Sequence, residues 1–449
     1  MQRNKDFIKH ILALSYPIFL QNLFSSLMNM TKLLMVGQLG DTAVAAVGLV
    51  GQITFVLSVI LFGASSGGSI FFAQFWGARD TKGVHKALGV YLTLGLMIGA
   101  LFTLGGLLFP EQVLGVFSQD SAVIALGSQY LRILAPTYLM LAVIYVYSFA
   151  QRSTGQVKLP MRVSILSLLV DILLAYGLIF GNFGLLKVGI LGGAISVLVA
   201  RFLEGFVLIG LTYRLRTPIA ASLREMFSFN FAFVKRVLMK VVPVMGNELM
   251  WSTGITIYTI IFARISTEAI ATYNIMSTLD NLGFALFMGL NNASAIVVGQ
   301  TIGLGDEEHA QQYARRAVNL QTRLAFAQGL IYIGISMPYV GLFRVSETVH
   351  FLAVRIIWVL GACLWLRVTN AGYLIGALRS GGDTRFAYLL DIGSMWLIGV
   401  PLVAISAFVL HLPVYLVYLA AMMDELFKFI VVSGRFRSKR WIHNVVRAI

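Results

Sequence analysis

Long apolar stretches, separated by short polar loops, run the whole length of the chain. A helix that crosses a bilayer needs roughly 20 mostly apolar residues. Within lipid the backbone must satisfy its own polar groups, which favours helices. The pattern therefore predicts an all-α membrane protein with twelve spans, six in each half of the sequence. We expect these spans at 13–36, 46–76, 88–109, 126–150, 163–181, 188–213, 241–263, 270–303, 324–343, 353–378, 386–410 and 413–434.

The second half of the sequence repeats the first half at an offset of 226 residues, which becomes 227 near the middle of each half. Prolines and glycines recur in register, so we expect the same backbone bends twice. Duplicated units of this kind are common in secondary transporters. The matched positions include Pro17 and Pro243, Gly63 and Gly289, Gln74 and Gln300, Asp80 and Asp306, Arg152 and Arg379, and Gly155 and Gly382.

This repeat predicts two pseudo-symmetric lobes of six helices each. We expect a first lobe at 1–220, a cytoplasmic linker at 221–240, and a second lobe with a basic cytoplasmic tail at 241–449. The longest polar stretch, 214–240, could form a short amphipathic helix at the membrane surface. Both halves begin on the same side of the membrane, so the lobes should be related by a twofold axis along the membrane normal.

The composition is typical of a membrane protein. The positions of the basic residues indicate which loops lie on the cytoplasmic side. The chain is 58% hydrophobic and only 12% charged, with a formal net charge of +15, whereas soluble domains carry about 25% charged residues. Most of the Lys and Arg residues lie in alternate loops and at both ends. Because such residues collect on the cytoplasmic side, we expect both termini on the cytoplasmic side of the membrane. A nucleic-acid partner is not expected, since its basic residues would cluster on one soluble face.

Motifs for the usual chemistries are missing from the sequence. There is no GxxxxGK[ST] loop and no HExxH pair, and Cys363 is the only cysteine. We therefore expect neither an enzyme nor a cofactor. Energy for transport would come from an ion gradient, carried by Na⁺ or H⁺.

Charged side chains inside the expected spans are the strongest functional signal, because charges at membrane depth are costly and usually face the protein interior or a wet cavity. Lys32 could snorkel to the headgroups, and Asp171 could be a buried structural acid. Glu248 lies between a proline and a glycine of its span. Asp280 could be structural or functional, and Arg367 could pair with either of these last two acids.

Other polar residues of the spans have weaker signals. Asn247, Asn291, Asn292 and Asn370 could line a cavity or join neighbouring helices. Two close pairs, Arg201 with Glu204 and Asp424 with Lys428, are expected to be structural.

Several of these motifs together resemble the multidrug and toxic compound extrusion (MATE) family, in its Gram-positive-like bacterial branch. The resemblance extends over the whole chain and rests on MVGQLG at 35–40, AVAAVG at 43–48, QRSTGQVKLP at 151–160, NELMWSTGITIY at 247–258 and ALRSGGDTRF at 377–386. It implies a MATE/MOP-type fold of twelve transmembrane helices in two lobes. It also implies a monomer that exports cationic, amphipathic compounds in exchange for Na⁺ or H⁺.

The sequence departs from the family pattern in its first lobe. Lys32 stands where an acid is expected before the MVG motif, and Asp171 lacks its usual polar companion because Ala175 follows one turn later. A Lys32–Asp171 ion pair would explain both departures. The family's acid in the seventh span matches Glu248, so coupling should fall mainly on the second lobe, with Asp280 as a weaker helper.

We therefore expect cation coupling at Glu248, Asp280 and Asn247, with Glu248 as the residue that could bind Na⁺. An alternative function is a flippase or exporter of a lipid-linked or anionic substrate, favoured if the basic residues face a cavity. A channel or scaffold without coupling is a third interpretation. Expected contacts with a small-molecule substrate within the bilayer come from Lys32, Asp171, Asn29, Gln21, Tyr258, Asn291, Asn292, Arg367 and Asn370.

Overall fold

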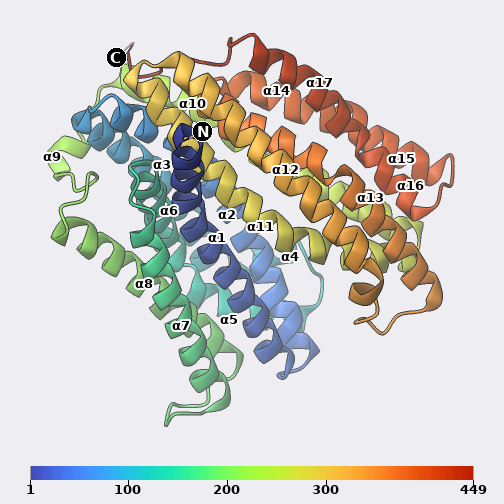
Figure 1. Ribbon diagram of the computed structural model, residues 1–449. Helices are drawn as coiled ribbons and strands as arrows, with labels where there is room; N and C mark the ends of the chain where they lie inside the picture. Colours follow the sequence, from blue (N-terminus) through green and yellow to red (C-terminus); the bar gives the residue numbers. More distant parts are fainter. Residues whose placement is uncertain (1, 448–449) are drawn as a thin grey trace. The chain divides into compact units, whose positions relative to one another are not determined.

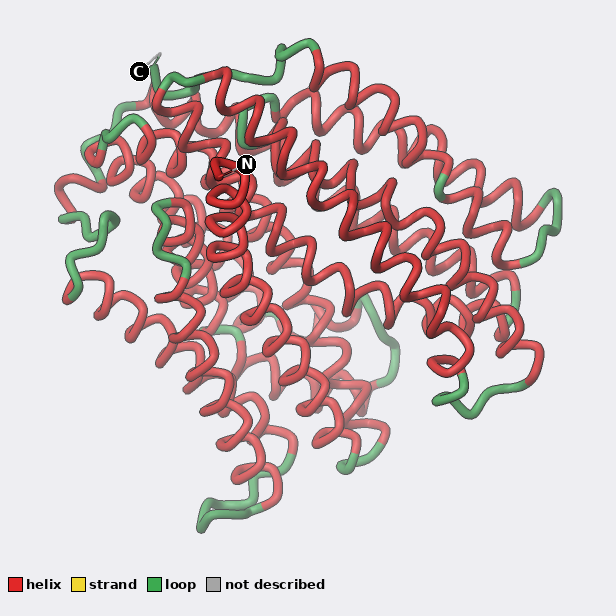
Figure 2. Tube along the Cα trace, viewed as in Figure 1, coloured by secondary structure: helices red, strands yellow, loops and turns green. Residues whose placement is uncertain are grey.

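Residues 2–447 are described by a computed structural model, and helices make up almost all of them. No β-strand occurs within this range (Figure 2). A single isolated antiparallel bridge joins Gly382 to Ile442. The expected all-helical secondary structure is therefore confirmed.

Each expected span coincides with one helix or with two or three consecutive helical segments (Figure 1). The first repeat contains α1 (Gln2–Gly37), α2 (Asp41–Gly77), α3 (Thr81–Leu108), α4 (Pro110–Gly115), α5 (Ser121–Leu134), α6 (Thr137–Ser153), α7 (Lys158–Phe180), α8 (Ile190–Arg214) and α9 (Leu223–Met226). The second repeat contains α10 (Phe231–Ile265), α11 (Thr267–Leu304), α12 (Glu307–Val340), α13 (Glu347–Ala371), η1 (Gly372–Arg379), α14 (Thr384–Ser394), η2 (Met395–Gly399), α15 (Val400–Phe408), α16 (Val414–Ala421) and α17 (Met423–Arg437).

Length and hydropathy alone identify fewer spans than the twelve expected. Among the described residues, 8 helices are long and apolar enough to cross a membrane, or 9 if the bent pair α5–α6 forms one span. Helices α10 and α12 do not meet this test, because polar and charged side chains interrupt their apolar sequence. Helices α16 and α17 are each too short to meet it, with 8 and 15 residues.

The chain divides into two compact units whose boundaries fall inside helices. Unit 2 comprises Leu20–Val241, and unit 1 comprises Met1–Phe19 with Val242–Ile449. The first turns of α1 thus pack in unit 1, where Phe7 stacks on Tyr313 with ring centroids 5.1 Å apart. The first turns of α10 pack in unit 2, where Phe233 lies against Phe75 with centroids 6.2 Å apart. The lobe boundaries expected from the repeat remain a prediction.

Much of the expected linker at 221–240 is helical. Helix α10 already begins at Phe231, where Asn230 Oδ1 accepts a hydrogen bond from the backbone N–H of Phe233 at 2.9 Å. Of the expected amphipathic helix only α9 forms, capped by Ser222 and Glu225 in a reciprocal capping box. Hydrogen bonds from the Ser222 backbone and hydroxyl lower the pKa of the Glu225 carboxyl.

The backbone confirms the repeat at the positions where it was expected. Asp80 precedes α3 with φ −94° and ψ 84°, and its counterpart Asp306 precedes α12 with φ −96° and ψ 79°. Both carboxylates accept a backbone N–H of the helix that follows. Gly155 and Gly382 have φ +86° and +78°. These left-handed values favour glycine, because a Cβ would be strained there.

Bends in the helices have local causes. Helices α5 and α6 meet at 51° on either side of Pro136, which has no N–H to continue the helix. In the second repeat, the π-helical segment η2 ends just before Pro401 of α15. The other π-helical segment, η1, lies between Asn370 and Ser380. Such segments often occur near functional sites.

Close packing of α12 on α13 shows how one helix pair of unit 1 is held (Figure 1). A Cβ added to Gly329 would clash with the carbonyl oxygen of Gly361, and one added to Gly361 would lie 2.6 Å from the Gly329 carbonyl oxygen. Small residues that let backbones approach are typical of membrane helix pairs. These two glycines therefore set the separation of α12 and α13.

The basic C-terminal segment folds back onto unit 1. Trp441 is fully buried and stacks on Phe436 with centroids 5.6 Å apart. The N–H of His443 donates to the carbonyl oxygen of Gly381 at 2.8 Å. Arg435 pairs with Asp383 at 2.8 Å. The tail thus covers the loop after η1.

Candidate functional site

An ion pair joins α1 to α7 in unit 2. The Lys32 ammonium donates to both carboxylate oxygens of Asp171, at 2.8 Å for Oδ1 and 2.7 Å for Oδ2. The two side chains are only 16% and 11% exposed. The expected pairing is confirmed, so Lys32 is held within the repeat rather than extended toward the headgroups.

Two arginines of unit 2 interact with the same buried acid. Arg201 donates to Glu204 Oε2 at 2.7 Å on α8, which confirms the expected structural pair. Arg152 lies close enough to Glu204 to interact electrostatically. Its guanidinium donates to the amide oxygen of Gln21 at 2.6 Å, and its Nε has no partner among the described residues. Arg152 therefore lacks a carboxylate of its own.

The repeat-related Arg379 has an acidic partner instead. Its Nη1 donates to Glu248 Oε1 at 2.6 Å, and the two side chains are 7% and 14% exposed. This arrangement resembles Arg152 with Gln21, with a carboxylate in place of the amide. Glu248, the expected coupling acid, is thus already bound to a base.

A second ion pair of unit 1 joins α11 to α13. Arg367 donates to Asp280 Oδ2 at 2.8 Å, and the side chains are 19% and 14% exposed. The other carboxylate oxygen, Oδ1, is buried without a hydrogen-bond partner in the described chain. Of the two partners considered for Arg367 from the sequence, the structure selects Asp280.

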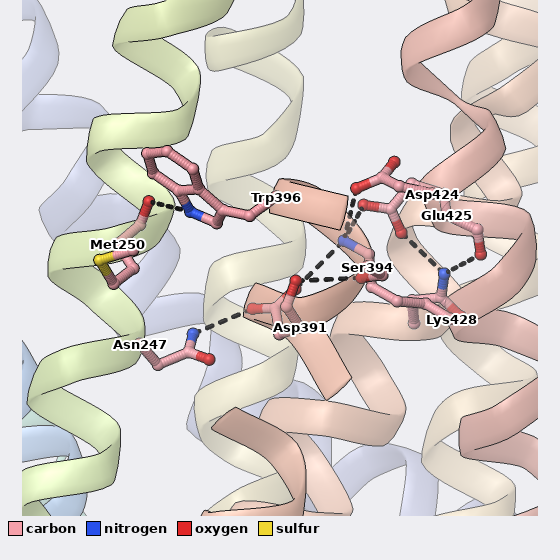
Figure 3. A network of polar contacts seen from close by, with 9 residues as sticks. Asn247, Met250, Asp391, Ser394, Trp396, Asp424, Glu425 and Lys428 are labelled. Atoms are coloured by element: carbon pink, nitrogen blue, oxygen red, sulfur yellow. Dashed lines mark hydrogen bonds and ion pairs between the residues drawn. The ribbon is translucent and has the colours of Figure 1, made fainter. Parts of the chain in front are cut away.

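Lys428 on α17 is surrounded by carboxylates (Figure 3). Its ammonium lies 2.8 Å from Glu425 Oε1, 3.1 Å from Asp391 Oδ1 and 3.3 Å from Asp424 Oδ2. The side chains of Lys428 and Asp424 are 4% and 5% exposed. Within the described residues one base therefore serves three buried or nearly buried carboxylates. We call these four residues the Lys428 cluster.

Two asparagines join the Lys428 cluster to other helices of unit 1. Asn247 on α10 donates to Asp391 Oδ2 at 2.9 Å (Figure 3). Asn370 on α13 donates to Glu425 Oε2 at 2.7 Å. Both amide oxygens are buried and have no partner in the part of the chain that the structure describes. Asn247 and Asn370, expected as site residues, thus both contact this cluster.

Tyr258 on α10 lies beside Asp424. A Cβ added to Gly399 would clash with the Tyr258 hydroxyl and would lie 3.3 Å from the carboxyl carbon of Asp424. The tyrosine is 7% exposed, and its hydroxyl has no hydrogen-bond partner among the described residues. An unsatisfied hydroxyl therefore stands next to the cluster.

Other expected cavity residues lie apart from these groups. Asn291 is fully buried, and neither atom of its amide has a partner among the described residues. Asn292 donates to the backbone carbonyl of Met288 at 2.7 Å. Asn29 is exposed on α1. None of these contacts shows a role in transport, and that role stays a prediction.

Sequence reasoning missed Asp391 and Glu425 and treated Asp424 with Lys428 as an ordinary pair. A signal was present, because Asp391 and Glu425 both fall within expected spans. Their proximity in space was not visible, since Asp391 is 37 residues from Lys428 and 144 residues from Asn247. The Lys428 ammonium occupies the centre of the cluster. Within residues 2–447 no group of three or more His, Cys, Asp or Glu side chains is arranged to hold a metal ion.

The repeated architecture of this chain matches a known family of membrane transporters. A repeated helical unit with ion pairs inside its spans is typical of a secondary membrane transporter. The family model described as MatE matches residues 17–177 and 243–405, once in each repeat. The chain therefore belongs to the MatE family of membrane transporters, whose members are not enzymes.

Curated relatives cover nearly the whole chain. The "Probable multidrug resistance protein NorM" of Thermotoga maritima is 23% identical over 443 residues, covering 96% of this chain and 93% of its own. That of Pseudomonas aeruginosa is 27% identical over 415 residues, covering 89% of this chain and 83% of its own. The "Uncharacterized transporter YisQ" of Bacillus subtilis is 24% identical over 436 residues, covering 96% of this chain and 94% of its own.

Solved structures show the same fold. A crystal structure of MATE in the bent conformation has a TM-score of 0.88 at 19% identity, covering 97% of this chain and 96% of its own. A MOP superfamily transporter from Pyrococcus furiosus, with a reversed polarity of its binding pocket that suggests a different function, has a TM-score of 0.84 at 19% identity, covering 96% and 95%. The fold is thus that of twelve transmembrane helices in two six-helix lobes.

Proposed function

We propose that this protein is a secondary active antiporter that exports organic compounds, cationic and amphipathic, in exchange for entering Na⁺ or H⁺. Family membership and the multidrug resistance names of the curated relatives support the export of drugs. The coupling ion would act on the second repeat, where Glu248, Asn247 and Asp280 were expected from the sequence.

The observation that carries this proposal is the surplus of carboxylates around Lys428. One ammonium contacts Asp391, Asp424 and Glu425 inside a poorly exposed part of unit 1. Buried negative charge without a counter-charge is unfavourable. A cation or proton that enters this region would relieve that cost, and its release would restore it. This difference in free energy between the ion-bound and ion-free states can couple an ion gradient to a conformational change.

Transport in membrane vesicles tests the proposal. A fluorescent organic cation such as ethidium would be followed while Na⁺ and pH gradients are imposed separately. We expect one of the two gradients to drive accumulation of the dye against its own gradient. Dye movement that responds to neither gradient would contradict antiport.

The alternative function is export or flipping of a lipid-linked or anionic substrate. It is supported by Arg152, which has the Gln21 amide rather than a carboxylate as its partner. The Pyrococcus furiosus transporter with reversed pocket polarity is a structural relative at 19% identity. Competition of the dye transport by organic anions would favour this alternative, whereas competition by organic cations alone would favour the main proposal.

Localisation and orientation complete the proposal. The membrane would be the bacterial plasma membrane, with both termini cytoplasmic, because Lys and Arg collect in alternate loops and at the chain ends. The protein would act as a monomer on a small-molecule substrate. Cysteine labelling of one residue introduced in the linker and of one introduced between α4 and α5 would test the orientation.

A further inference from the structure

We propose that Asp424 on α17 is the residue that binds and releases an exchangeable proton in the second repeat. This inference rests on the proposed antiport. It goes further by naming the coupling ion as a proton and by placing it at the Lys428 cluster rather than at Glu248.

The other two carboxylates of the cluster are better satisfied as anions. Asp391 accepts from Lys428 at 3.1 Å and from the Asn247 amide at 2.9 Å. Glu425 accepts from Lys428 at 2.8 Å and from the Asn370 amide at 2.7 Å. Hydrogen bonds to the charged form of an acid favour that form. Each of these two carboxylates therefore has both an ammonium and an amide donor.

Asp424 is the least stabilised anion of the three. Its contact with Lys428 is the longest, at 3.3 Å, and it is the most buried, with a side chain 5% exposed against 12% for Asp391 and 16% for Glu425. No amide donor to its carboxylate occurs among the described residues. Burial with little compensation favours the neutral acid.

The Tyr258 hydroxyl supplies the second observation. It is 7% exposed, lies beside the Asp424 carboxyl, and has no hydrogen-bond partner among the described residues. A hydroxyl can both donate and accept. The hydroxyl is not hydrogen-bonded to Asp424 in the structure. After a small side-chain movement it would accept from a protonated Asp424, or donate to the carboxylate once the proton has left.

The other charged groups near the Lys428 cluster do not neutralise its excess negative charge. Among the described residues, the charged and titratable groups that interact with the cluster are Glu425 and Lys428 on α17, Asp391 on α14, Arg379 on η1, Tyr258 on α10 and Arg367 on α13. The two arginines are already bound to Glu248 and Asp280. One proton on Asp424 would reduce the excess negative charge that Lys428 leaves uncompensated.

A proton fits this site better than a metal cation. The Lys428 ammonium stands at the centre, where a metal ion would need the same carboxylate oxygens. Uptake adds the proton to a carboxylate oxygen of Asp424 and gives a neutral carboxylic acid. Release breaks that O–H bond and returns the proton to water.

Protonation at Asp424 can reach the rest of the repeat through Lys428. Loss of the Asp424 charge removes one attraction on the ammonium and leaves those to Asp391 and Glu425. Asp391 is bound to Asn247, which precedes Glu248 on α10. The π-helical segment η2 begins four residues after Asp391. Asp424 is thus connected to α10 through a chain of polar contacts (Figure 3).

The test measures ethidium accumulation in proteoliposomes of the full chain under a pH gradient of one unit. A gradient of that size can concentrate a substrate about tenfold for each proton exchanged. We expect Asp424→Asn to lower the steady-state accumulation by about tenfold, while movement of the dye down its own gradient continues. In weakly buffered detergent solution, dye binding should release one fewer proton from this variant than from the wild type.

Glu268→Gln is the matched control, because Glu268 is an exposed acid in the first turn of α11. It should behave like the wild type. If Asp424→Asn responds to the pH gradient as fully as the wild type does, the inference is overturned. The proposed antiport would not be affected by that result. Wild-type coupling to Na⁺ alone would also overturn it. A wild type that responds to no gradient would instead remove the proposed function.

A second variant covers the case in which Asp424→Asn does not fold. Asp424→Glu keeps the acid but moves its carboxyl by one methylene relative to Tyr258 and Lys428. We expect it to remain coupled, with the pH of half-maximal transport shifted from the wild-type value. An unchanged pH profile would show that this carboxyl does not carry the proton.

Discussion

Lys32 and Asp171 are 139 residues apart in sequence, yet the ammonium of the first donates to both carboxylate oxygens of the second. The resemblance to the MATE family implies a departure at each of these two positions, and the two residues have opposite charge. The pair lies in unit 2 with less than a fifth of either side chain exposed. Opposite charges that contact at this depth explain why both are tolerated.

Removal of either member of this pair should destabilise the protein. Lys32→Met or Asp171→Asn alone leaves a poorly exposed charge without its partner, which typically costs about 3–5 kcal/mol. The double variant should recover most of that loss. Thermal unfolding in detergent would measure all four proteins of the cycle. Strictly additive losses would show that the two side chains do not stabilise each other.

Glu248→Gln should reduce stability as well as coupling. Arg379 donates to this carboxylate at 2.6 Å, and the arginine side chain is only 7% exposed. Loss of the carboxylate therefore strands a buried guanidinium, at a cost of about 3–5 kcal/mol. Glu248→Gln combined with Arg379→Gln should be the more stable variant. Thermal unfolding would compare the single and the double variant. Equal losses of stability in the two variants would contradict this prediction.

Gln21→Glu should separate the two candidate substrate classes. The new carboxylate would stand where the Gln21 amide now accepts from Arg152, and the pair would resemble Glu248 with Arg379. Neutralising Arg152 should weaken the transport of an organic anion by at least about tenfold, a typical loss for one charge-assisted contact of roughly 1.5–3 kcal/mol. Export of ethidium should change little. Equal effects on both substrates would argue against an anion contact at Arg152.

Gly329→Ala should weaken the packing of α12 on α13. The added Cβ would clash with the backbone of Gly361, which cannot rotate away. Overpacking of this kind costs typically about 1–3 kcal/mol. Gly334→Ala on the same helix is the control, since nothing lies within 4 Å of its added Cβ. The control should be neutral or slightly stabilising, because alanine favours helices over glycine by about 1 kcal/mol.

Local sequence was a good guide to the helices but a poorer guide to their ends. Helix α10 begins at Phe231, inside the expected linker at 221–240, with a cap from Asn230. Hydropathy does not mark this helix start, because the first ten residues of α10 include Lys235, Arg236 and Lys240. These residues are helical and belong to unit 2.

The candidate site was only partly visible in the sequence. Asn247 and Glu248 were recognised because a polar pair between a proline and a glycine is conspicuous in an apolar helix. Asp391 and Glu425 were overlooked, although each lies within an expected span. Their meaning depends on which helix faces they occupy, and a single acid in a span does not reveal its neighbours.

The sequence by itself determined the membrane class, the helical spans, the duplicated unit and the family, because these depend on hydropathy, on proline and glycine positions and on local motifs. Only the tertiary structure decided which acid contacts which base. Glu248 and Asp280 each have an arginine, whereas Asp424 shares Lys428 with Asp391 and Glu425. Charge pairing acts over a few ångströms between helices distant in sequence, so it is set by how those helices rotate and pack.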